Sequence, residues 1–106
     1  MNKAVLMGRL TRNPVVRVST KGLPFAGFTL AVIRRIENNG EEETDYIKCI
    51  TFDKQAEFAK KYIKQGSKIL VVGRMQNYSY IGNNGQSILG LQIIVEEVEF
   101  AESKVR

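Results

Sequence analysis

The chain has 106 residues, of which 43% are hydrophobic and 25% charged, and its formal net charge is +5. This length fits a single domain with one core, and the composition excludes a disordered or fibrous chain. Histidine is absent and Cys49 is the only cysteine, which excludes a disulfide framework and a Cys/His zinc site and fits a reducing compartment.

No segment has the pattern of a signal sequence or a membrane span. The longest apolar run, Pro24 to Ile33, is about half of the ~20 residues that a spanning helix needs. We therefore expect a cytoplasmic protein with no membrane partner.

Basic residues are concentrated in particular segments of the chain. Residues 1–36 carry seven bases and no acid, residues 37–45 carry five acids and no base, and residues 46–80 carry seven bases and two acids. Positive charge gathered in this way suggests a polyanionic partner. The alternative is a basic surface that serves only solubility.

The first third of the chain is patterned as strands. Short β-branched segments at Val5–Met7 and Val15–Val18 are separated by a turn at Asn13-Pro14. Phe25–Arg35 follows as a long apolar strand, with one face that carries Phe28, Leu30 and Val32.

A polar connection precedes the next strand. Asn38-Asn39-Gly40 and the glutamates Glu41–Glu43 predict a solvated, mobile loop that reaches to Asp45. The residues Tyr46–Phe52 then alternate as a strand whose aromatic and basic side chains recur at every second position.

One helix interrupts the strands. Asp53 is expected to cap it with its carboxylate, and Ala56, Ala59 and Ile63 recur at helical spacing. Gly66 is expected to close the helix in the left-handed conformation.

Two long strands complete the pattern. Ile69–Tyr80 and Ser87–Phe100 are joined by a hairpin signal at Asn83-Asn84-Gly85. The order predicts an all-β domain over residues 1–106, namely an OB fold: a five-stranded Greek-key barrel with one helix between its third and fourth strands.

Strand parity places aromatic and basic side chains on common faces, because residues two apart point the same way. One strand presents Tyr46, Lys48, Ile50 and Phe52 on one face and Ile47, Cys49 and Thr51 on the other. The later strand presents Arg74, Gln76, Tyr78 and Tyr80 together. Rings that stack on bases, beside cations for phosphates, are what sequence-independent single-strand binding requires. The alternative is that these rings belong to the core, with Lys48 and Arg74 at its edge.

Several phrases, taken in order, resemble the bacterial single-stranded DNA-binding proteins. They are Asn2–Pro14, Phe28–Val32, Asp45–Phe52, Ala56-Glu57, Lys64–Ser67, Gly73–Gln76 and Tyr78–Tyr80. The resemblance spans nearly the whole chain, from Asn2 to about Phe100. It implies binding and protection of single-stranded DNA, without sequence preference, during replication, recombination or repair.

The resemblance also implies roles for individual residues. Aromatic residues that stack on bases correspond to Tyr46, Phe52 and Tyr80. Basic residues along the DNA path correspond to Arg17, Lys48 and Lys54.

Two positions in the strands depart from the family pattern. Ile36 replaces a frequent aromatic, which removes a stacking platform, and Arg34 or Arg35 offers a guanidinium plane nearby. Tyr78 replaces a frequent basic residue and offers a compensating platform.

Assembly and location follow from the same resemblance. Family members usually form tetramers, so we expect a homotetramer with an interface near Asn2–Leu10, in the cytoplasm and associated with the nucleoid. Many members continue into an acidic tip that recruits replication and repair proteins, whereas this chain stops at Glu102–Arg106. Replication partners recruited through such a tail are therefore in doubt.

Two other function classes compete with this interpretation. A protein-interaction module of the primosome-accessory type would use the same fold to dock a helicase. A nuclease would need acid–base residues, whereas Cys49 is on a predicted core face and the carboxylates lie in one loop and the last strand, away from the basic faces. No enzyme activity and no cofactor are expected, and Gly8, Gly66 and Gly73 are interpreted as backbone requirements rather than a phosphate loop.

Overall fold

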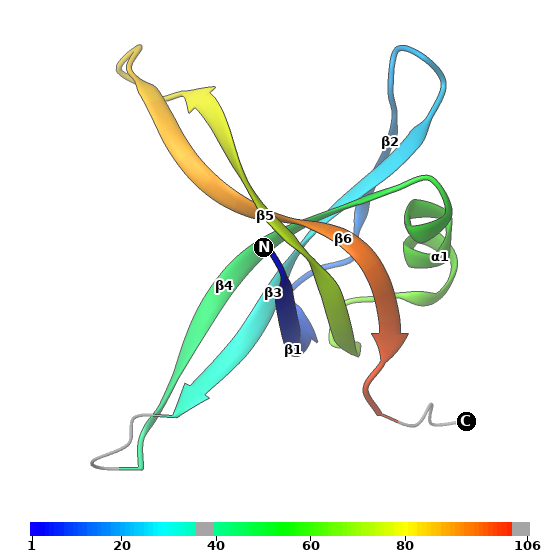
Figure 1. Cartoon of the computed structure of the whole chain (residues 1–106), viewed down its shortest axis with the longest axis vertical. Helices are drawn as coiled ribbons and strands as arrows, with labels where there is room; N and C mark the ends of the chain where they lie inside the picture. Colours follow the sequence, from blue (N-terminus) through cyan, green and yellow to red (C-terminus); the bar gives the residue numbers. More distant parts are fainter. Residues whose placement is uncertain (36–39, 103–106) are drawn as a thin grey trace.

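The computed structural model describes residues 1–35 and 40–102 (Figure 1). Its elements are β1 (Ala4–Leu10), β2 (Val15–Val18), β3 (Pro24–Arg35), β4 (Glu42–Phe52), α1 (Lys54–Tyr62), β5 (Lys68–Ile81) and β6 (Ser87–Phe100). Ile36, where we expect a platform to be lost, lies outside the described residues, as do Asn38, Asn39 and the chain end from Ser103.

The sheet closes into a barrel. Its strand order is β1-β5-β6-β4-β3-β2, and β1 also pairs with β3, so that five strands form the ring and β2 extends it as a hairpin with β3. The β4–β6 pairing is parallel and joins only Cys49 to Ile93 and Ile50 to Ile94. The helix α1 follows β4, the third strand of the ring, and precedes β5, the fourth, which confirms the predicted OB fold.

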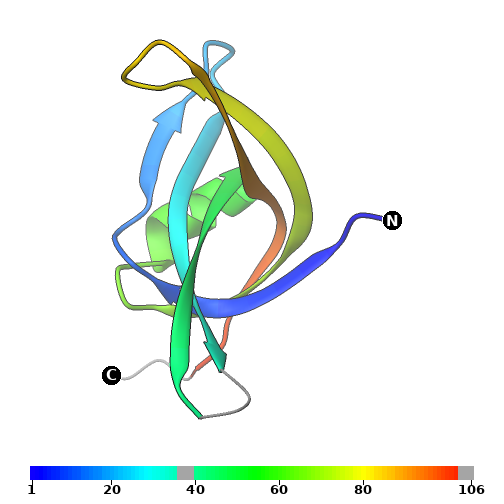
Figure 2. The ribbon, with the colours of Figure 1, turned by 90° about the vertical axis from the view of Figure 1, so that its left-hand side faces the viewer.

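The core fills the barrel and extends under the helix. The largest fully buried side chains are those of Leu30, Ile69, Val71, Thr51 and Cys49, of which Thr51 is polar. α1 packs against β3, β4 and β6 and buries Ala56 and Ala59, with Ile63 buried just beyond it, as their spacing predicts. Figure 2 shows the strands curving around this core, with α1 on its far side in that view.

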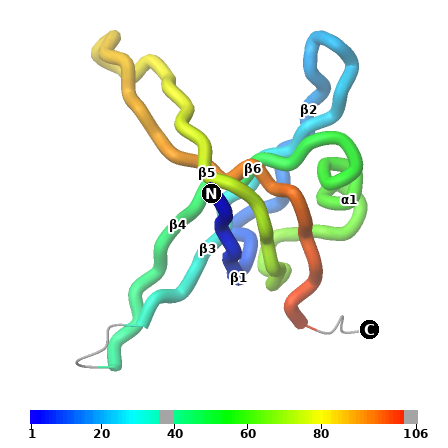
Figure 3. Tube along the Cα trace, in the orientation of Figure 1, coloured from blue at the N-terminus to red at the C-terminus, as the bar shows by residue number. Residues whose placement is uncertain are grey.

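Long hairpins extend beyond the core. The β2–β3 and β5–β6 hairpins splay apart on one side of the molecule, and the β3–β4 hairpin runs in the opposite direction (Figures 1 and 3). The exposed ends of β3, β4 and β5 agree with this arrangement, because burial stops where the strands leave the core.

Both predicted caps of α1 differ from the structure. The Asp53 side chain makes no capping hydrogen bond among the described residues, because β4 turns into α1 at this one residue and fixes its φ at 54°. With ψ at −118°, this backbone lies outside the β-region from which a capping side chain works. At the other end Ile63 is extended so that its side chain is buried, and Gly66, at φ 87°, serves the next turn instead of closing the helix.

The predicted loop before β4 is partly strand. In the β3–β4 ladder, Glu42 pairs with Arg35 and Glu43 pairs with Arg34. The expectation of a solvated connection up to Asp45 is therefore wrong for these residues. Opposite charges on facing strands favour this pairing. Polar composition alone predicts a loop here and does not reveal the strand.

Few groups in the described part of the chain are suited to reaction chemistry. Cys49 is fully buried, and its burial raises the pKa of the thiol to about 12, so that the reactive thiolate is disfavoured. Among residues 1–35 and 40–102, no cluster of three or more His, Cys, Asp or Glu side chains could hold a metal ion. Within the same residues, no helix is long and apolar enough to cross a membrane.

Candidate nucleic-acid interface

The outer face of β4 carries the aromatic and basic residues that parity assigned to one side. Tyr46 is 68% exposed and Phe52 48%, whereas Cys49 and Thr51 on the opposite face are fully buried. Thr51 donates its hydroxyl hydrogen to the carbonyl of Ala26 at 3.0 Å, which satisfies the one buried polar side chain of this face. The alternative that these aromatics belong to the core is therefore wrong for Tyr46 and Phe52.

The strand register extends this face across the neighbouring strands. Phe52 faces Phe25 in β3, and Phe25 in turn faces Arg17 in β2. The two phenyl rings are tilted by 37° with their centroids 6.4 Å apart. A predicted cation and a predicted platform thus lie in one row, separated by an aromatic residue that our sequence analysis did not include.

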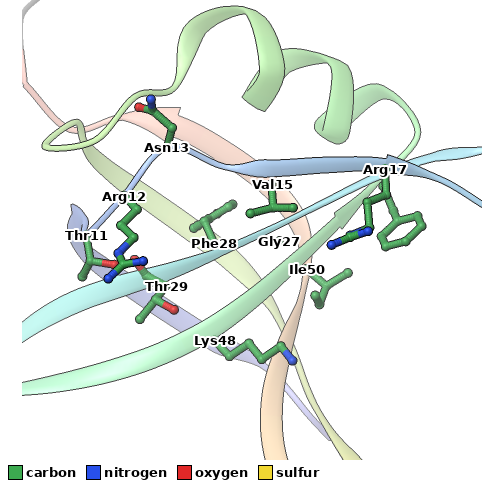
Figure 4. Close-up of a pocket in the computed structure, with 11 residues that line it drawn as sticks. Thr11, Arg12, Asn13, Val15, Arg17, Gly27, Phe28, Thr29, Lys48 and Ile50 are labelled. Atoms are coloured by element: carbon green, nitrogen blue, oxygen red, sulfur yellow. The ribbon is translucent and has the colours of Figure 1, made fainter.

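A groove opens beside this row (Figure 4). Its volume is about 510 Å³, and Gly27 lies between the larger side chains that surround it. The lining residues are Thr11, Arg12, Asn13, Val15, Arg17, Phe25, Gly27, Phe28, Thr29, Lys48 and Ile50. The lining thus combines three cations, two hydroxyl groups and one amide group, and no carboxylate.

The cations of the groove come from different parts of the chain. Arg12 precedes β2, Arg17 lies within β2 and Lys48 within β4, and Figure 4 shows Arg12 and Arg17 at opposite ends of the groove. None of the ion pairs between described residues involves these three side chains. Their charges are available to an anionic ligand such as a phosphate.

The predicted face of β5 is also observed. The Nη1 group of Arg74 donates to the Oε1 atom of Gln76 at 3.3 Å. The rings of Tyr78 and Tyr80 stack with centroids 5.9 Å apart and planes 21° apart, and Tyr80 is 50% exposed. The ammonium of Lys48 lies 4.3 Å from the centroid of Tyr78, which joins the predicted faces of β4 and β5 into one surface.

The remaining predicted cations have different surroundings. Arg34 donates to both carboxylate oxygens of Asp45, at 3.1 and 3.3 Å, and to Glu43 at 3.1 Å, while Arg35 lies 3.6 Å from Glu42. The pKa of Arg34 is raised, mainly by the hydrogen bond to Asp45 and, to a smaller extent, by the negative charges of Asp45 and Glu43. The expectation that the carboxylates lie away from the basic faces is therefore wrong at this hairpin. Lys54 is exposed at the first position of α1, two residues after Phe52.

Tyr46 borders a second groove, and one of the two cations in this groove is already paired. This groove, of about 610 Å³, also contains Arg9 and Lys68. The guanidinium of Arg9 forms two hydrogen bonds to Glu102, at 2.8 and 3.0 Å, and a third to the carbonyl of Gly66. Among the described residues, the groove of Arg12, Arg17 and Lys48 therefore offers more cations without a carboxylate partner than the groove beside Tyr46.

Arg12, Phe25 and Thr29 also belong to this surface, although they were not predicted from the sequence. Phe25 has the parity opposite to the core residue Phe28, so its outward direction could have been predicted from the strand alone. Arg12 lies in the bend between β1 and β2, where parity gives no direction. Its position in the groove depends on how β2 pairs with β3, for which the sequence holds no local signal.

Comparison with known proteins agrees with the resemblance found in the sequence, and it extends over almost the whole chain. Residues 1–101 match the model of the single-strand binding protein family. The chain is 44% identical over 105 residues to "Single-stranded DNA-binding protein 3" of Listeria innocua and 43% identical to "Single-stranded DNA-binding protein" of Halalkalibacterium halodurans. These alignments cover 98% of the chain but 66% and 62% of the two relatives, so the chain spans less than two thirds of their length. The relatives' names describe DNA binding and name no reaction.

Proposed function

The chain belongs to the single-strand binding protein family, and on that premise we propose that it binds single-stranded DNA without reading the base sequence. One observation carries the proposal: exposed aromatic rings, and cations with no carboxylate partner among the described residues, share a surface formed by β2, β3, β4 and β5. Rings accept any base because every base has a π-face, and cations follow the phosphates, which are the same for every sequence. The relatives' names, which specify single-stranded DNA, support the same ligand.

The exposed rings are assigned to the bases. Tyr46, Phe52 and Tyr80 stack on bases, each contributing about 1–3 kcal/mol to the free energy of binding. Their exposure supports this role, because each presents about half or more of its surface to a ligand.

The cations are assigned to the phosphates. Arg12, Arg17 and Lys48 bind phosphates in the groove, and Lys54 on α1 and Arg74 on β5 bind phosphates outside it. Arg34 and Arg35 contribute only where a phosphate displaces their own carboxylate partners, Asp45, Glu43 and Glu42. We assign these two arginines a smaller share of the affinity than the groove cations.

The proposal is tested by titrating the intrinsic fluorescence of the four tyrosines, since the chain has no tryptophan. We expect oligo-dT to quench this fluorescence and a duplex of equal length to leave it nearly unchanged. The logarithm of the binding constant should fall with the logarithm of salt concentration with a slope of about −0.7 for each phosphate contact, hence about −2 for the three groove cations. Equal affinity for duplex and single strand would contradict the proposal.

We extend the proposal to the assembly and the cellular role. The protein acts as a homotetramer in the cytoplasm, where it protects single strands during replication, recombination or repair. The exposed apolar side chains Val5 and Met7 on β1 support an interface between copies at this strand. Sedimentation equilibrium should give four chain masses, and a monomer at micromolar concentration would contradict the tetramer.

A further inference from the structure

Tyr78 has surroundings unlike those of the other aromatic residues on this face. Lys48 from β4 places its ammonium 4.3 Å from the ring centroid, and Tyr80 stacks beside the ring at 5.9 Å. Tyr78 is also partly buried, whereas Tyr46, Phe52 and Tyr80 are exposed. The ring thus already has neighbours from its own strand and from β4.

A further neighbour is a glycine near the start of β6. Gly90 faces Tyr78 in the β5–β6 ladder. A Cβ atom added to Gly90 would lie 2.6 Å from Cζ, 2.7 Å from the hydroxyl oxygen and 2.8 Å from Cε1 of Tyr78. These distances are too short for real contacts, so the ring occupies space that exists only because residue 90 has no side chain. Glycine in a strand interior often marks such a close approach.

We propose that Tyr78 is a positioning residue, which holds the Lys48 ammonium in place for DNA, and that it is not itself a base platform. This inference rests on the proposed function and assigns a role within the same site. A base that stacked on Tyr78 would have to displace the Lys48 ammonium, while Gly90 and Tyr80 restrict the ring from other directions.

The physical benefit lies in the lysine side chain. A free lysine samples many rotamers, and binding a phosphate costs the entropy of fixing it. A cation–π contact with Tyr78 restricts the ammonium to the space above the sheet before DNA arrives. Part of that entropy is then lost on folding rather than on binding. Gly90 is required because it allows the ring to lie where the lysine can reach it.

A double-mutant cycle on oligo-dT affinity tests this role. Tyr78→Leu should weaken binding by about three- to tenfold, the range of a cation–π contact. If Tyr78 acts through Lys48, the Tyr78→Leu/Lys48→Met double variant should bind within about twofold of Lys48→Met alone. An independent base platform would instead give losses that multiply, and that result would overturn the proposal.

Three further variants separate positioning from general damage. Tyr78→Phe keeps the ring and should restore wild-type affinity. Gly90→Ala leaves Lys48 and Tyr78 unchanged but pushes the ring away, so it should reproduce the loss of Tyr78→Leu; wild-type affinity in a folded Gly90→Ala protein would also overturn the proposal. Tyr62→Leu, which removes an exposed tyrosine from α1, is the matched control and should bind like the wild type.

An NMR measurement without DNA keeps this inference distinct from the proposed function. The ε-methylene protons of Lys48 should be shifted upfield by the Tyr78 ring in the wild type, and the shift should vanish in Tyr78→Leu. An absent shift in the wild type overturns the positioning contact even if DNA binds. If the shift is present but oligo-dT does not bind, the proposed function fails, and the role of Tyr78 toward DNA fails with it.

Discussion

Replacing Tyr46, Phe52 and Tyr80 together by alanine should lower the affinity for oligo-dT at least about a hundredfold, because three lost stacks at about 1 kcal/mol or more each add to about 3 kcal/mol or more. All three side chains lie on the outer face and present about half or more of their surface to solvent. Their loss removes binding surface and leaves the barrel core intact. The binding constant is measured by the fluorescence anisotropy of a dye-labelled oligo-dT, since the variant lacks two of the four tyrosines.

The salt dependence of the triple variant distinguishes stacking from charge. Arg12, Arg17 and Lys48 remain in the groove, so the slope of affinity against salt should stay near that of the wild type while the affinity falls. Tyr62→Ala is the control for the loss of an exposed tyrosine and should change the affinity less than about twofold. Binding of the triple variant within fivefold of the wild type, with an unchanged melting temperature, would show that these rings are not the platforms.

The face of β4 could be predicted because it depends on a local rule. Side chains alternate along any strand, whatever the strand pairs with, so Tyr46 and Phe52 on one face and Cys49 and Thr51 on the other follow from the sequence. The same rule places Arg74 and Tyr80 together on β5. It fails only where the chain leaves the strand, as at Arg12.

Contacts between strands could not be predicted, because they depend on register. Nothing in the sequence places Lys48 over Tyr78, or Phe25 beside Phe52, until the order β5-β6-β4-β3 is known. The ion pairs of Arg34 show the same limit. Five acids among the nine residues 37–45 resemble a solvated loop by composition, yet Glu42 and Glu43 lie in β4, opposite Arg35 and Arg34. Asp53 failed as a cap because the sharp turn from strand to helix sets its backbone, which residue preference alone does not reveal.

The backbone requirement predicted for Gly8 and Gly73 has a specific cause in the barrel. A Cβ atom on Gly8 would lie 2.3 Å from the carbonyl oxygen of Ala31, and one on Gly73 would lie 2.1 Å from that of Ile94. Both contacts are with backbone, which cannot rotate away as a side chain can. Gly73 also adjoins the irregularity between Val72 and Gly73 in the β5–β6 ladder. These glycines therefore allow strands to approach closely where the barrel curves.

Gly73→Ala should accordingly destabilise the fold by about 3 kcal/mol or more, the upper range for overpacking, because β5 and β6 must separate to admit the methyl group. The free energy of unfolding is measured by urea denaturation followed by circular dichroism. Gly27→Ala in β3 is the matched control: its Cβ would come no closer than 3.4 Å, to the flexible end of Ile50, so its stability should stay within about 1 kcal/mol of the wild type. A Gly73→Ala protein as stable as Gly27→Ala would mean that the strands can separate at little cost. The position of the Tyr80 platform on β5 would then depend less on the close approach of β5 and β6 than the geometry around Gly73 indicates.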